Sequence, residues 1–153
     1  MHSEPVRQTQ LQECKIALVG TYPPPIGGVS IHVKRLKRAL DERKIPCVVY
    51  DLDSTGTVEE PGVVPTGSLF VWVIRHLLSG SEHIVHYHGH GWLSRFILLV
   101  LKLRSKRAVF TFHSLRENAE SIHPVKRILA QLVLRYGDHF VATGPGVRDK
   151  LIA

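Results

Sequence analysis

Short apolar runs alternate along the chain with longer segments of helical periodicity. Five runs of five to seven residues are rich in β-branched, aromatic and other apolar side chains, which is typical of buried strands. These runs lie at residues 15–20, 47–53, 84–88, 108–113 and 139–143. Segments in which apolar residues recur every three or four positions begin near Val29, Ser68, Trp92 and Pro124, and another begins near Val147. The pattern therefore predicts strands and helices in alternation.

This alternation predicts an α/β fold: a Rossmann-like, doubly wound parallel sheet with helices on both faces. Right-handed crossovers favour the strand order 3-2-1-4-5. In that order strand 15–20 lies beside strand 108–113, so the Gly27-Gly28 turn would face His113 where the winding reverses. Residues 54–67 are rich in Gly, Pro and Thr and are predicted to form a loop.

Length and composition set the domain organisation and the class of partner. The 153 residues suffice for one domain, predicted at 14–153 after a polar, flexible tail at 1–13. The net charge of +7 favours an anionic partner. Cys14 and Cys47 without a secretory leader predict reduced thiols and a cytoplasmic location. No apolar run approaches the roughly twenty residues needed to span a bilayer.

Ligands in such sheets bind at the carboxyl ends of the strands, and every predicted end carries distinctive residues. These ends are Gly27-Gly28, Asp51 and Asp53, His88 to Gly91, His113-Ser114, and Thr143 to Gly146. Among these residues His113 is the strongest candidate, because an imidazole can donate a hydrogen bond to a sugar hydroxyl or a carbonyl. Its alternative role is to cap the following loop. Arg116 and Lys126 could meet an anionic ligand, or could be solvated cations.

The alternating His86, His88 and His90 suggest a second chemistry. On one continuous strand all three would point to the same face, and His-x-His is a metal-ligand spacing. However, no carboxylate or cysteine stands nearby in the sequence to complete a zinc site, and Gly89 would end the strand early. Hydrogen-bonded histidines in a cleft or core are the simpler interpretation, so no metal is assigned.

The segment Trp92 to Arg104 is apolar over most of its circumference and basic at its end. It is interpreted either as a helix buried on several sides or as a basic, aromatic face on an anionic membrane. The first interpretation needs no partner. The second would place the protein peripherally at the inner face of a membrane.

Four segments together resemble a known family, the group 1 (family 4) glycosyltransferases of the GT-B fold. They are the strand that leads into residues 24–33, the strand ending at 86–90, residues 109–114, and the closing 141–143. The similarity is to the N-terminal, acceptor-side domain and covers nearly the whole chain from Lys15. It implies a retaining sugar transfer from a nucleotide-sugar donor to a glycan or lipid-linked acceptor, as in polysaccharide biosynthesis, with no cofactor and no nucleic acid partner.

The resemblance also implies roles for individual residues. Gly27 and Gly28 match the loop that approaches the donor phosphates, and His113 matches the histidine beside the transferred sugar. The acceptor would lie near His88 and His90 and near Ser114 and Arg116. The family usually has a serine where this chain has Thr143, which leaves that loop without an assigned contact. The C-terminal domain that holds most of the donor is absent, so the chain alone is expected to be inactive.

Three rival functions differ in their requirements. A nicotinamide-dependent oxidoreductase needs Gly-x-Gly-x-x-Gly in the first turn, which residues 27–30 lack, although Asp51 or Asp53 is placed to hold a ribose. A metal-dependent hydrolase would use His86, His88 and His90. A non-catalytic module would use the basic surface to bind an anion, a glycan or a membrane.

Overall fold

The computed structural model describes residues 15–24, 26–53, 60–89, 91–104, 106–113 and 123–152. Six parallel strands form one sheet in the order β3-β2-β1-β4-β5-β6. The strands are β1 (Ile16–Gly20), β2 (Cys47–Asp51), β3 (Val63–Pro65), β4 (Ile84–His88), β5 (Arg107–Phe112) and β6 (His139–Ala142). The predicted Rossmann-like parallel sheet is therefore confirmed.

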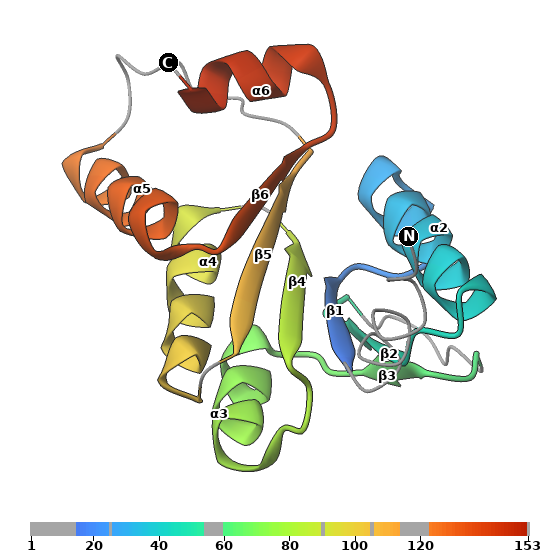
Figure 1. The fold of residues 1–153 in the computed structure, drawn as a ribbon. Helices are drawn as coiled ribbons and strands as arrows, with labels where there is room; N and C mark the ends of the chain where they lie inside the picture. The colour runs from blue at the N-terminus through green and yellow to red at the C-terminus, as the bar shows by residue number, and fades with distance from the viewer. Residues whose placement is uncertain are drawn as a thin grey trace, which may run out of the picture.

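Helices lie on both faces of this sheet (Figure 1). Helix α2 covers one face, and α3, α4 and α5 cover the other. The helices are α2 (Gly28–Glu42), α3 (Leu69–Ser79), α4 (Trp92–Leu99), the 3-10 helix η1 (Val100–Arg104), α5 (Pro124–Tyr136) and α6 (Pro145–Ile152). The predicted helix 92–104 is thus an α-helix that tightens into a 3-10 turn.

Alternation along β1 divides the core into two clusters. Ala17 and Val19 point to the face of α3, α4 and α5, while Leu18 points to α2. The first cluster is the larger and is built on Trp72 and Phe110, whereas the second holds Val33, Val49 and Tyr22. The apolar stripe of α2 at Val29, Val33, Leu36 and Leu40 packs into this second cluster, as helical periodicity predicts.

The short strand β3 corrects the sequence prediction in two ways. Residues 63–65 lie within the segment 54–67 that was predicted to be a loop, but they pair in parallel with β2. Counting β3, the order 3-2-1-4-5 is confirmed, with β6 added at the edge. Counting β3 also raises the number of each later strand by one, so residues 84–88 form the fourth strand and residues 107–112 the fifth. Residues 84–88 therefore pair with β1, and residues 107–112 lie one strand further away.

Candidate functional site

The winding of the sheet reverses between β1 and β4. Gly20 and His88 end these two strands and lie opposite each other in the register. A Cβ on Gly20 would lie 3.0 Å from the Cβ of His88 and 3.2 Å from its carbonyl oxygen, so a larger residue at position 20 would require the end of β4 to shift by a few tenths of an ångström. His88 is therefore the histidine at the reversal point. His113, which the predicted strand neighbours placed there, lies after β5 instead.

Four histidine rings gather on the sheet face that α2 covers. His86 and His88 come from β4, His113 follows β5, and His32 comes from α2. The ring centroid of His88 lies 4.1 Å from that of His86 and 5.4 Å from that of His32. The ring of His113 lies 5.1 Å from His32, edge-on, and 5.8 Å from His88. These four residues, here called the histidine cluster, form one continuous set of contacts.

Burial keeps three of these imidazoles neutral at pH 7. Burial, with a smaller contribution from neighbouring imidazoles of the cluster, lowers the pKa of His88 to about 2 and that of His86 to about 4. Burial also lowers the pKa of His32, with a second contribution from Arg35. A neutral imidazole offers one donor and one acceptor nitrogen, so these rings can exchange hydrogen bonds with neutral hydroxyl groups.

The rings of His86 and His88 differ in their hydrogen bonding. The Nε2 atom of His86 lies 2.8 Å from the Oγ1 atom of Thr111. His88 is fully buried, and neither of its ring nitrogens has a hydrogen-bond partner among the described residues. A buried polar group without a partner is costly and rare, which makes His88 an unusual feature of this face. Because the side chain of His88 has no exposed surface, an acceptor substrate would not contact its ring directly.

The glycine turn begins α2 beside this cluster. Gly27 is the N-cap residue, its N–H donates to the Ser30 hydroxyl at 2.8 Å, and that hydroxyl donates to the Gly27 carbonyl at 3.1 Å. A Cβ on Gly28 would meet nothing within 4 Å, and one on Gly27 only the Ser30 oxygen at 3.8 Å. The packing of the described residues therefore does not require glycine at either position. No acidic residue lies in the first turn, so no carboxylate of that turn offsets the positive end of the helix dipole.

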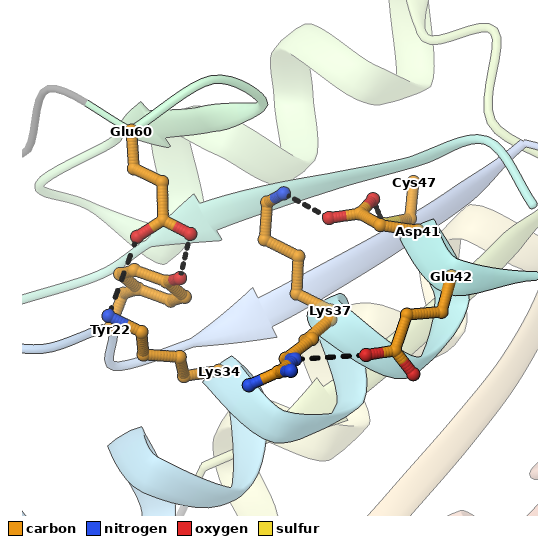
Figure 2. A network of polar contacts seen from close by, with 8 residues as sticks. Tyr22, Lys34, Lys37, Asp41, Glu42, Cys47 and Glu60 are labelled. Carbon is orange, nitrogen blue, oxygen red and sulfur yellow. Dashed lines mark hydrogen bonds and ion pairs between the residues drawn. The ribbon is translucent and has the colours of Figure 1, made fainter. Parts of the chain in front are cut away.

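Tyr22 fixes the start of the loop that carries these glycines (Figure 2). Its backbone N–H donates to Oδ1 of Asp51 at 3.0 Å, and its hydroxyl donates to Glu60 at 2.7 Å. Lys34 of α2 reaches the same carboxylate at 3.7 Å and lies 5.9 Å from the centre of the tyrosine ring. The loop is thus tied to β2, to the segment before β3 and to α2 at once.

Asp51 holds the backbone and does not line an open site. It is fully buried, and its Oδ1 atom also accepts from the N–H of Asp53 at 3.1 Å. Of the two acids suggested for a ribose contact, Asp51 has no exposed surface and Asp53 is exposed. The end of β5 is held similarly, since the Thr143 hydroxyl donates to the Phe112 carbonyl at 3.1 Å.

Arg95 holds the turn that follows β4. This buried guanidinium donates to the carbonyls of Gly89 at 2.8 Å and Gly91 at 3.1 Å, and it lies 4.1 Å from the centre of the Phe112 ring. Burial lowers its pKa to about 10, which leaves it charged at pH 7. Arg95 therefore fixes the chain on both sides of residue 90.

The remaining candidate residues and sites of the sequence analysis do not join the histidine cluster in the described structure. His90, Ser114 and Arg116 lie outside the described residues. No group of three or more histidine, cysteine, aspartate or glutamate side chains in the described ranges could hold a metal ion. A hollow of about 610 Å³ lies between α5, β6 and α6, and its lining includes Thr143 and Gly144 but none of the histidine cluster.

Sequence reasoning missed His32. It lies three residues after Val29 and four before Leu36, so it belongs to the buried stripe of α2 by spacing. That spacing could have identified it as an inward-facing polar residue. Its contacts with His88 and His113 could not be predicted, because they depend on which strands lie under the helix.

The fold and the site together define a Rossmann-like α/β domain whose candidate site lies at the carboxyl ends of its central strands. Residues 26–153 match the family model of Glycosyltransferase Family 4. The chain belongs to this family, and the predicted resemblance is confirmed.

Comparison with other proteins adds little to this assignment. A search of curated protein sequences gives no significant match. Two solved structures of S. aureus homoserine dehydrogenase, at pH 7.0 and pH 6.5, are similar with 14% and 15% identity and TM-scores of 0.44 and 0.43. The matches cover 86% and 84% of this chain but only 32% and 31% of those chains, so this chain spans about a third of their length. Similarity this low carries no argument about function.

Proposed function

We propose that this chain is the acceptor-side domain of a retaining glycosyltransferase. The complete enzyme moves a sugar from a nucleotide-sugar donor to a glycan or a lipid-linked acceptor. One observation carries the proposal: in a member of this family, the His113 ring packs against His32 on the helix that Gly27 and Gly28 begin. His113 and the glycine turn therefore lie within about two helical turns of each other.

The glycine turn is suited to the diphosphate of the donor. The positive end of the helix dipole at the start of α2 favours an anion there. The open space around Gly27 and Gly28 lets phosphate oxygens approach the backbone. A second domain, as in GT-B enzymes, would hold the rest of the nucleotide-sugar, so we expect the present chain alone to be inactive.

His113 is assigned to the transferred sugar. Its imidazole can donate a hydrogen bond to a sugar hydroxyl, and His32 restricts the orientation of the ring through their edge-on contact. His88 lies beneath both rings and supports them. The acceptor would approach from the ends of β4 and β5, where His90, Ser114 and Arg116 remain the candidate contacts.

Measured transfer by the complete enzyme tests this assignment. His113→Ala removes the imidazole that donates a hydrogen bond to the transferred sugar. We expect kcat to fall about 100-fold with little change in stability. His139→Ala changes an exposed histidine at the start of β6 and serves as the matched control. NMR of the product anomer tests retention separately. Unchanged turnover in His113→Ala would refute the role of this residue.

The rival enzyme class receives less support. A metal-dependent hydrolase needs at least three convergent ligands; the described residues hold no such group, and His90 of the set His86, His88 and His90 lies outside them. Metal analysis of the purified protein checks this directly, and a stoichiometric ion would contradict our proposal.

A further inference from the structure

Helix α3 exposes apolar side chains on the side that faces away from the core. Phe70 and Val71 are each 61% exposed, Ile74 is 44% exposed and Leu78 is 73% exposed. Their spacing places them along one side of the helix. The other side packs Trp72 and neighbouring residues into the larger core cluster. Helix α3 is therefore apolar both toward the core and toward solvent.

Helix α2 shows how a water-facing helix of this protein is built. Its outer side carries charged residues in ion pairs, such as Arg38 with Glu42 at 2.9 Å. Helix α3 contains no acidic residue, and Arg75 is its only lysine or arginine. A helix made only to face water has no need of four exposed apolar side chains, so the outer face of α3 is suited to a partner.

Basic residues lie near the C-terminal end of this apolar face. The 3-10 helix η1 packs against α3 and exposes Leu103 to 79%. Lys106 donates to the Gly80 carbonyl at 3.0 Å, which joins the turn after η1 to the end of α3. Arg104 and Arg107 flank this junction and are exposed. The α3 face is defined here as Phe70, Val71, Ile74, Arg75, Leu78, Leu103, Arg104 and Arg107.

This part of the chain has almost no negative charge. Between residues 61 and 113 the sequence contains one acidic residue, Glu82. Glu82 is buried and accepts a hydrogen bond from the Tyr50 hydroxyl at 2.6 Å. The arginines of the α3 face therefore lie in a segment that exposes no carboxylate among its described residues. The nearby carboxylate of Asp138 is held by Lys102 at 2.7 Å and by the Ala108 N–H at 2.7 Å, so the arginines are suited to an anionic surface.

We propose that the α3 face docks onto an anionic lipid bilayer. The apolar side chains enter the boundary between headgroups and acyl chains, and Arg75, Arg104 and Arg107 contact lipid phosphates. A symmetric dimer through this face would bring the arginines of two copies together, which disfavours a second copy as the partner. No helix in the described ranges is long and apolar enough to span a membrane, so the contact is peripheral.

The element that carries this contact differs from the one suggested by the sequence. The sequence pattern left the segment 92–104 either as a buried helix or as a membrane face, and the buried Arg95, Leu98 and Leu101 agree with the first interpretation. Among its residues, Leu103 and Arg104 contribute to the α3 face. None of the residues of this face belongs to the histidine cluster, so docking can be tested without donor or acceptor, and the test is independent of the proposed sugar transfer.

Flotation of the chain with lipid vesicles tests the proposal. We expect binding to vesicles of phosphatidylcholine mixed with phosphatidylglycerol, weaker binding to phosphatidylcholine alone, and loss of binding as salt rises. Changing Arg104→Gln and Arg107→Gln should each weaken binding about fivefold. The double change Phe70→Gln and Leu78→Gln should weaken it about tenfold or more.

Matched variants on α2, across the sheet, separate docking from general effects. Arg35→Gln and Ile31→Gln alter exposed residues of the same types and should leave binding unchanged. Circular dichroism confirms that each variant is folded. Absence of binding to the mixed vesicles at low salt, or an equal loss in the α2 variants, would overturn the proposal. So would self-association without vesicles that the Phe70 and Leu78 changes abolish.

Discussion

Acid should destabilise this domain through His86 and His88 before it protonates the carboxylates. Their pKa values in the folded chain are about 4 and about 2, against about 6.5 in an unfolded chain. Because burial has lowered both pKa values, there is a pH range below about 6.5 and above each folded pKa. In this range the histidine is protonated in the unfolded chain and neutral in the folded chain. The contribution of these two histidines to the free energy of unfolding is therefore complete above about pH 6.5 and decreases as the pH falls below that value.

The size of the effect follows from the same pKa values. At about pH 5, each of the two histidines lowers the free energy of unfolding by about 2 kcal/mol. Together they remove on the order of 4 kcal/mol, a large part of the 5–15 kcal/mol typical of a domain. Glu82 titrates in another window, since its pKa is lowered to about 2 and its contribution is lost only below about pH 4.5.

Urea unfolding at about pH 7.5 and about pH 5 measures this loss. His88→Gln removes one titrating ring, so the difference in stability between the two pH values should shrink by about half. This comparison holds even if the variant is less stable at both pH values. His139→Gln, an exposed control, should keep the full difference. An equal difference in His88→Gln and the unaltered chain would refute the reasoning, as would the absence of any difference.

Three substitutions near the glycine loop separate packing from function. Gly20→Ala should destabilise the fold by about 1–3 kcal/mol in urea unfolding, because its Cβ would press on His88. Gly28→Ala should leave stability equal or slightly higher, because its Cβ meets open space, yet should raise the KM for the donor in the complete enzyme. Tyr22→Phe removes the hydrogen bond to Glu60 and should cost about 1 kcal/mol, with KM for the donor raised more than kcat is lowered. An unchanged donor KM in Gly28→Ala and Tyr22→Phe would count against the phosphate role of this loop.

Most of the fold could be predicted from the hydrophobic pattern because its central strands are largely buried. Such strands appear as short, continuous apolar runs, as β1, β2, β4 and β5 do, and the exposed edge strand β6 is also apolar enough to be recognised. Strand β3 does not, since it has three residues and only Val63 is buried. Its pairing with β2 depends on the sheet already being present, which a local pattern cannot indicate.

The candidate site was predictable only as far as chain order allowed. The rule that ligands bind at strand ends identified Gly27, His88 and His113 from the sequence, because His88 ends a strand, His113 follows one and Gly27 lies in the loop after one. The rule does not say which strand ends are adjacent, and the unrecognised β3 gave β1 the wrong neighbour. With β4 beside β1, His88 occupies the reversal point, and α2 brings His32 into contact with both other rings. Missing this strand of three residues led to the prediction that His113 alone lies at the reversal point. In the structure His88 lies there, and His113 is packed against His88 and His32.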